Sequence, residues 1–173
     1  IFAFAFHLCP LTTICCSQTR KIDNCAFRGC KKLGQVFLPV CEEVGAGCFM
    51  QCKGLKVLDL PRVKRVGEAL LQDCPSLTDL LIPSTEEIGR NCFGNCGALQ
   101  QIWSKLEPLG FVCADQRCNK HKRCIICRGQ LEECLQKGNN PQNRLRVQSE
   151  LEEQKLLLLK EVGVEPSLEL RQE

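Results

Sequence analysis

Hydrophobic residues recur along the chain with a period of 22 residues, from its beginning to beyond residue 100. The most regular file consists of leucines: Leu11, Leu33, Leu55, Leu77 and Leu99. An apolar residue stands three places after each leucine and, except in the last copy, another stands five places after it. This alternation predicts a short strand in each unit, and the fixed period predicts that the units stack as a repeat protein.

The other half of each unit carries cysteine and aromatic residues at spacings of three. Three places before the leucines stand Leu8, Cys30, Cys52, Cys74 and Cys96, and three places further back stand Ala5, Phe27, Phe49, Leu71 and Phe93. The units open with Ile22, Val44, Val66 and Ile88, and glycine follows the last three. The apolar spacing of this half predicts a short helix or 3-10 turn. Since neither half can bury its apolar side alone, the units must stack.

This repeated pattern, for example "IGRNCFGNCGALQQI", resembles the BspA-like class of the leucine-rich repeat superfamily over about residues 1–126. The resemblance implies an α/β solenoid with short parallel strands on the concave side and helical or 3-10 turns on the other, and we expect C-terminal helices to follow it. We expect about five recognisable units and a degenerate last rung in residues 1–128. Because Ile1 falls inside a unit, we expect the first coil to be truncated, with repeats or another protein covering that end.

Residues 129–173 differ in character and predict a helical extension. Leu131, Cys134 and Leu135 share one helical face, and Gly138 suits the end of that helix. Pro141 suits the first position of a second helix that ends near Gly163. The extension either covers the last rung or docks on another subunit.

Composition limits the classes of protein to which this chain could belong. The chain has 173 residues, of which 44% are hydrophobic, so it can bury a core. Its net charge of +3 is too small to indicate nucleic acid or acidic lipid. Its apolar runs fall short of the roughly 20 residues that a membrane span needs.

Sixteen cysteines raise the question of disulfides. The cysteine column suits small thiols in a narrow core position. Leu8 occupies the same column and needs no partner, which favours reduced cysteines and therefore an intracellular protein over a secreted one.

The segment "CNKHKRCIIC" holds the candidate chemistry. Cys118, His121, Cys124 and Cys127 are zinc-ligand types, and the last two also match a dithiol redox pattern. In the phase of the repeat, however, Cys118 and Cys124 fall at core positions. The dithiol pair Cys124 and Cys127 also lacks the strand–helix–strand setting of a thioredoxin-like redox site. A zinc- or redox-active cysteine module within residues 113–134 therefore remains the alternative, and the preferred interpretation has no catalytic residue and no cofactor.

Five basic residues surround this segment: Arg117, Lys120, Lys122, Arg123 and Arg128. No aromatic residues are interleaved with them, as single-stranded nucleic acid would require. We therefore expect a solvated cap or a patch for an acidic protein, and no nucleic-acid partner.

The candidate binding residues lie between the core positions of the strands. They are Thr13, Cys15, Gln35, Phe37, Val57, Asp59, Asp79, Leu81, Gln101 and Trp103. Phe37, Val57, Leu81 and Trp103 form an apolar diagonal, which is typical of a protein interface. The alternative is that Phe37 and Trp103 cover an edge or lie beneath the terminal helices.

The sequence thus predicts a non-enzymatic protein-interaction scaffold, an accessory or structural subunit of a larger assembly. Its partners would bind the concave face and the C-terminal helices. The resemblance also leaves open a cell-surface adhesin, because some proteins of this repeat class have that role.

Overall fold

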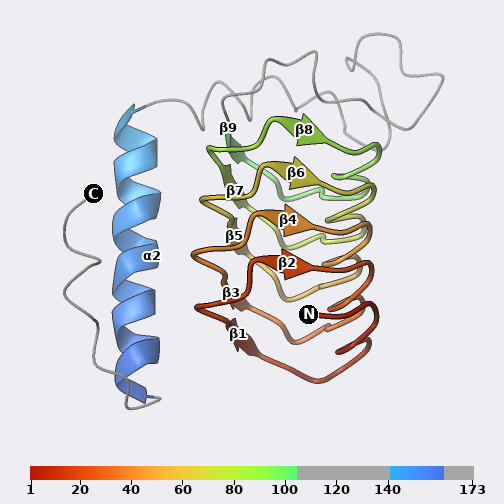
Figure 1. The fold of residues 1–173 in the computed structure, drawn as a ribbon. Helices are drawn as coiled ribbons and strands as arrows, with labels where there is room; N and C mark the ends of the chain where they lie inside the picture. Colours follow the sequence, from red (N-terminus) through yellow and green to blue (C-terminus); the bar gives the residue numbers. More distant parts are fainter. Residues whose placement is uncertain (105–140, 162–173) are drawn as a thin grey trace, which may run out of the picture. The chain divides into compact units, whose positions relative to one another are not determined.

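The computed structural model describes residues 1–104 and 141–161, which belong to two compact units, 1–139 and 140–173. In the first unit the described chain winds into stacked coils of parallel strands (Figure 1). One sheet has five strands: β1 (Thr13–Cys15), β3 (Gln35–Phe37), β5 (Val57–Asp59), β7 (Asp79–Ile82) and β9 (Gln101–Ser104).

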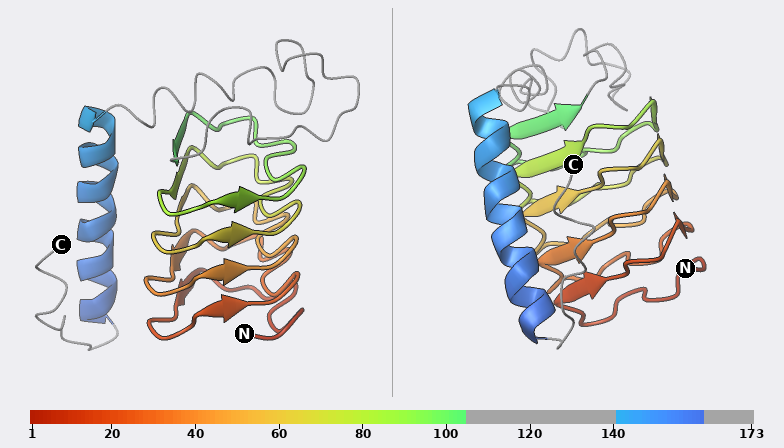
Figure 2. Two further views of the ribbon diagram at one scale, coloured as in Figure 1. Left: turned by 45° about the horizontal axis from the view of Figure 1, so that its top comes forward. Right: turned by 60° about the vertical axis from the view of Figure 1, so that its left-hand side comes forward.

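A second sheet lies on another side of the same coils. Its four strands are β2 (Lys21–Ile22), β4 (Glu43–Val44), β6 (Arg65–Val66) and β8 (Glu87–Ile88). In both sheets, residues 22 apart lie side by side: Ile14 pairs with Val36, and Val44 pairs with Val66. The two further views show the aligned coils (Figure 2). The solenoid and its 22-residue period are therefore confirmed.

The leucine file lies in the buried core of the coils. Leu33, Leu55 and Leu77 are fully buried, and the side chain of Leu99 is 8% exposed. Beside this file, aromatic rings stack between coils, with centroids 5.2 Å apart for Phe6 and Phe27 and 5.7 Å apart for Phe27 and Phe49. Each coil buries its apolar side chains against the next one, as the repeat predicts.

The helix predicted in each coil is not confirmed for the described coils, where the segment forms turns, such as the one closed by the hydrogen bond from the N–H of Cys30 to the carbonyl of Phe27. The backbone N–H groups of Cys25 and Phe27 donate to Ala46 and Cys48 of the next coil rather than along their own segment. Cys25 itself has a φ of 56°, and its equivalent Gly47 has a φ of 59°, a left-handed conformation that interrupts a helix. The segment is thus a series of turns bonded across coils.

The column assignments of Leu8 and Ala5 in the first coil are also wrong. Cys9 donates to the carbonyl of Phe6 (3.1 Å), as Cys30 does to that of Phe27 (3.2 Å). Cys9 and Phe6 therefore occupy the columns, while the side chain of Leu8 is 59% exposed. The reason is a missing residue: one residue separates Cys9 from Leu11, whereas two separate Cys30 from the next leucine.

Glycine after the second strand is required by the close approach of neighbouring coils. A Cβ atom at Gly67 would lie 2.3 Å from the backbone nitrogen of Ala46, and one at Gly89 would lie 2.4 Å from that of Glu68. Both distances are far below van der Waals contact, so any side chain here would push two coils apart.

The second unit contains α2 (Pro141–Glu161), a helix of 21 residues that corresponds to the one predicted to begin at Pro141. Arg146 and Glu150 form an i,i+4 ion pair on it, with Nε and Oε1 3.9 Å apart. Within the described ranges, no helix combines the length and the apolar character needed to cross a membrane. The shorter helix predicted between residues 129 and 138 lies outside the described residues.

Candidate protein-interaction face

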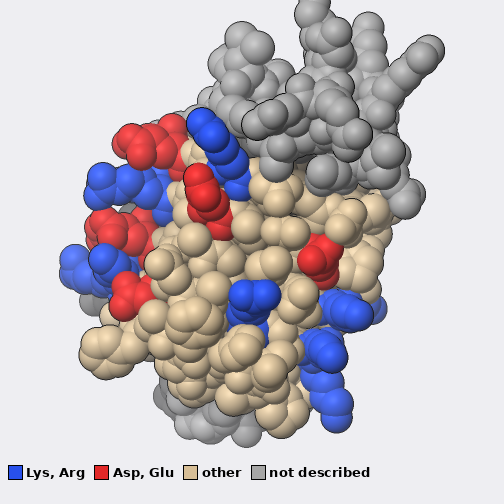
Figure 3. All heavy atoms as spheres, turned by 90° about the vertical axis from the view of Figure 1, so that its right-hand side faces the viewer, with Lys and Arg blue, Asp and Glu red and all other residues tan. Residues whose placement is uncertain are grey.

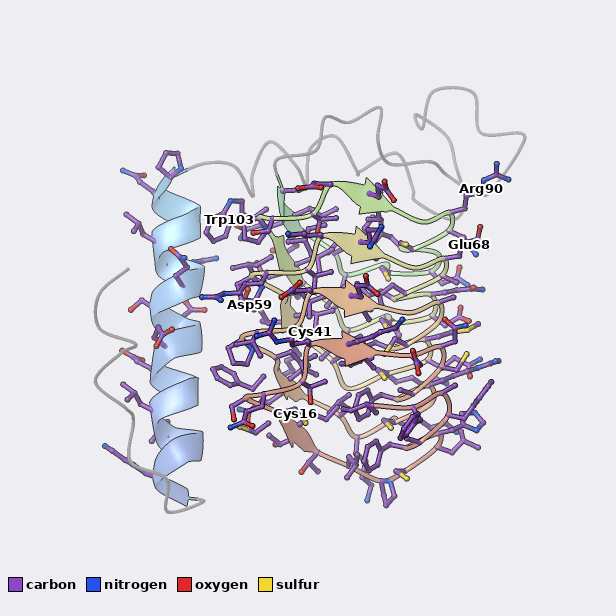
Figure 4. All side chains as sticks on the ribbon, viewed as in Figure 1. Cys16, Cys41, Asp59, Glu68, Arg90 and Trp103 are labelled. Carbon is purple, nitrogen blue, oxygen red and sulfur yellow. The ribbon has the colours of Figure 1, made fainter. Side chains whose placement is uncertain are left out.

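The predicted binding residues form two adjacent columns on the outward side of the five-stranded sheet, here called the strand face. The first column is Thr13, Gln35, Val57, Asp79 and Gln101, and the second is Cys15, Phe37, Asp59, Leu81 and Trp103. Figure 4 places the labelled Asp59 and Trp103 on this side, and Glu68 and Arg90 at the opposite turn edge. Residues from five coils thus share one surface.

The apolar residues of the strand face do not form an unbroken row. Asp59 pairs with Phe37 on one neighbouring strand and with Leu81 on the other, so a carboxylate interrupts the column. Leu81 pairs in turn with Trp103. Phe37 and Trp103 are half-buried, but Leu81 is only 3% exposed and belongs to the buried set.

Asp79 is the most unusual polar residue of the strand face. Its Oδ1 atom is buried and has no hydrogen-bond partner among the described residues. A buried acceptor without a donor costs free energy, typically about 1–3 kcal/mol. The strand face therefore holds a polar atom whose hydrogen-bonding capacity is not met by the described residues.

Hydrogen bonding explains why cysteine occupies this column. Each thiol donates to a backbone carbonyl of the preceding coil: Cys30 to Phe6 (3.1 Å), Cys52 to Phe27 (3.3 Å), Cys74 to Phe49 (3.1 Å) and Cys96 to Leu71 (3.0 Å). A small side chain with a weak donor fits this narrow position. The four cysteines of this column are free thiols.

Burial makes the column thiols poor ligands and poor nucleophiles. It raises the pKa of Cys52 and of Cys96 to about 12, and it also raises the pKa of Cys74. These residues stay protonated near neutral pH, whereas metal binding and nucleophilic attack need the thiolate. The column is therefore structural.

The four-stranded sheet carries a charged surface that the hydrophobic pattern of the sequence did not predict. Its outward positions form four rows, here called the charge ladder: Arg20 and Lys21, Glu42 and Glu43, Lys64 and Arg65, Glu86 and Glu87. Red and blue side chains alternate in profile at the left edge of Figure 3. The sequence does contain a signal for this surface, because the charge of these residues changes sign from each 22-residue unit to the next.

Ion pairs connect the rows of the charge ladder. Glu43 lies 2.9 Å from Arg65 and 3.5 Å from Lys21, and Arg20 lies 3.6 Å from Glu42. The hydrogen bond from Arg65, followed by that from Lys21, lowers the pKa of the Glu43 carboxyl group. Opposite charges on neighbouring coils therefore support the register of the stack.

The predicted zinc or redox segment lies outside the described residues, as does the surrounding basic cluster. Within residues 1–104 and the described part of α2, no group of three or more His, Cys, Asp or Glu side chains could hold a metal ion. The alternative built on Cys118, His121, Cys124 and Cys127 stays a prediction.

Comparison with known proteins identifies the class of repeat. Residues 1–108 match, in six copies, the family described as BspA type leucine rich repeat region. The match spans more than half of the chain, and the chain belongs to this family. It ends before residue 126, where the sequence resemblance was expected to end.

Two solved structures show the same fold. A leucine rich repeat protein of T. pallidum, TpLRR, is 32% identical, with a TM-score of 0.57 over 59% of this chain and 50% of that one. A leucine-rich repeat protein from Bacteroides ovatus is 29% identical, with a TM-score of 0.53 over 56% of this chain and 26% of that one. This chain thus spans about half the length of TpLRR. No curated protein matches it.

Proposed function

We propose that the protein is a non-enzymatic scaffold that binds another polypeptide through its strand face. The observation that carries the proposal is the combination of half-buried aromatic residues with the unpartnered, buried Oδ1 atom of Asp79 on one sheet. Aromatic residues supply much of the binding energy of protein interfaces. A backbone or side-chain donor from the partner would satisfy Asp79.

The two columns differ in what they offer a partner. In the second column Phe37 and Trp103 provide apolar contact area around Asp59, while the first column supplies the amides of Gln35 and Gln101. Amides can donate to and accept from a peptide backbone. This mixture suits an extended or loop segment of a partner better than a purely apolar helix.

An accessory or structural subunit of a larger assembly is the finer form of this proposal. A solenoid presents one long surface built from many coils, which suits a component that holds other chains in place. The helix α2 would supply a second contact surface.

The proposal is tested by affinity purification of the full chain from an extract of its source cells, followed by quantitative mass spectrometry. We expect specific partners to be depleted at least about tenfold by Phe37→Ala with Trp103→Ala, as hot-spot losses above about 1.4 kcal/mol imply. The matched control changes Glu68 and Arg90, two exposed residues at the opposite turn edge, to alanine. Equal recovery with both double variants would contradict the proposal.

A further inference from the structure

The charge ladder has a symmetry that goes beyond holding coils together. Its four rows read positive, negative, positive and negative along the stack, and both residues of each row carry the same sign. An even number of alternating rows is self-complementary: when the order is reversed, each row meets a row of opposite sign. We propose that the charge ladder is an isologous contact surface for a second copy of this chain.

The geometry fixes how the two copies would meet. The two-fold axis lies in the interface, parallel to the strands and between β4 and β6. Rotation about it places the first row of one copy against the fourth row of the other, so that Arg20 faces Glu86 and Lys21 faces Glu87. The second row faces the third, which brings Glu43 to the partner's Arg65. All eight charges of each copy then oppose a charge of the other sign.

Other arrangements of the same two surfaces are disfavoured. A two-fold axis along the stack would place every row against its own copy, and like charges would repel. A shift by one row from the proposed alignment also brings like rows together. Charge complementarity therefore selects one register, as isologous interfaces require.

The ladder is accessible enough to serve in this way. The side chains of Arg20, Lys21 and Arg65 are 81%, 65% and 65% exposed, and Glu42 and Glu43 remain 45% and 39% exposed despite their ion pairs. In the dimer each carboxylate would lie between cations of both copies, and such networks contribute more than isolated surface pairs.

The small extent of the surface limits the strength of the contact. Four strands about 4.8 Å apart give a narrow stripe, well below the roughly 800 Å² per partner of a standard interface. We therefore expect a weak, reversible dimer with strong salt dependence, because exposed charges are screened over about 3 Å at 1 M salt and about 10 Å at 0.1 M.

Sedimentation of the full chain over a range of concentrations tests the proposal. A dimer should form at about 20 mM salt, and its dissociation constant should rise at least about tenfold at about 1 M salt. A chain that sediments as a monomer at every concentration and salt level would overturn the proposal.

Two charge-reversed variants make the test specific. Variant one carries Arg20→Glu and Lys21→Glu, and variant two carries Glu86→Lys and Glu87→Lys. Each alone should lose association, because its first and fourth rows become alike in sign. An equimolar mixture should associate again, since the altered rows of the two variants then oppose each other with opposite sign, as do their unaltered first and fourth rows.

This rescue separates contact between copies from contact within one chain. The first and fourth rows lie three coils, about 14 Å, apart in one molecule, and mixing leaves each chain's own ladder unchanged. Circular dichroism shows whether both variants are folded. Association that survives in each variant alone would place the contact elsewhere, and folded variants that fail to associate on mixing would also overturn the proposal.

Discussion

The two sheets of the solenoid rest on the same interior but present opposite kinds of surface. On the four-stranded sheet the outward charges follow the repeat and alternate in sign from coil to coil. On the five-stranded sheet the second column changes from Phe37 to Asp59 to Leu81 to Trp103 without any period. Surface charges that repeat with the period form ion pairs between neighbouring coils. The fold does not require the irregular residues of the strand face. That irregularity adds support to the proposal that the strand face binds a partner.

The largest expected effect comes from the interior that both sheets share. Leu55 is fully buried, and Leu55→Ala should lower the free energy of unfolding by about 2–5 kcal/mol, because it removes apolar contacts and leaves a cavity. Gln35→Ala, an exposed change on the strand face, should stay within about 0.5 kcal/mol. Urea denaturation measures both. Similar losses for the two variants would mean that the strand face is needed for folding.

Two glycines beside the two sheets sharpen the comparison. Gly67 follows β6, and Gly67→Ala should cost about 1–3 kcal/mol, because its Cβ would meet backbone atoms of the neighbouring coil. Gly34 precedes β3, where a Cβ finds its nearest atoms 3.9 Å away, so Gly34→Ala should change stability far less. Thermal unfolding of the two variants would contradict this account if Gly34→Ala were the more damaging.

The thiol column predicts a loss of stability in alkali. The folded-state pKa of Cys52 and of Cys96 is about 12, above the ordinary cysteine value of 9.0, so between these values the unfolded chain releases protons that the folded chain keeps. This stability is thus present below about pH 9 and falls as the pH rises, by about 1.4 kcal/mol per buried thiol at pH 10.

Melting temperatures between pH 7 and pH 10.5 measure this effect. The double variant Cys52→Ala with Cys96→Ala should lose less of its pH 7 melting temperature on going to pH 10.5 than the unchanged chain loses. An unchanged slope would show that these thiols do not carry the effect.

The smallest effect is expected from a single charge on each sheet. Glu43→Lys places a cation between Lys21 and Arg65 and should lower the melting temperature slightly, with the loss shrinking at high salt. Gln35→Lys places a lysine on the strand face and should leave the melting temperature unchanged. Calorimetry at two salt concentrations distinguishes the charge ladder from the strand face if the effect of Glu43→Lys alone depends on salt.

The strict period made the solenoid, the leucine file and the register of Val44 with Val66 predictable from the sequence. The second strands were missed because two residues, such as Arg65 and Val66, are too short to show alternation. The first coil was misaligned because Leu8 and Cys9 both suit an apolar column, and only the backbone hydrogen bonds show that Cys9 is the equivalent of Cys30.

The candidate site was predictable in position but not in detail. Strand alternation placed Phe37 and Trp103 on one face, yet the pattern could not show that Leu81 is buried or that an oxygen of Asp79 lacks a donor. Both depend on the packing of side chains around each residue. The charge ladder escaped notice because hydrophobic periodicity carries no information about the sign of exposed residues.

The most direct measurement of the contrast between the two surfaces is site-specific photo-cross-linking of the full chain in its source cells. A photoreactive residue is placed at Phe37 on the strand face, at Glu43 on the charge ladder, or at Met50 on the turn segment as a control. We expect position 37 to cross-link a different polypeptide, position 43 to cross-link a second copy of this chain, and position 50 to cross-link neither. A strand-face position that captures no polypeptide, or one that captures the same product as position 50, would contradict the assignment of partner binding to the strand face.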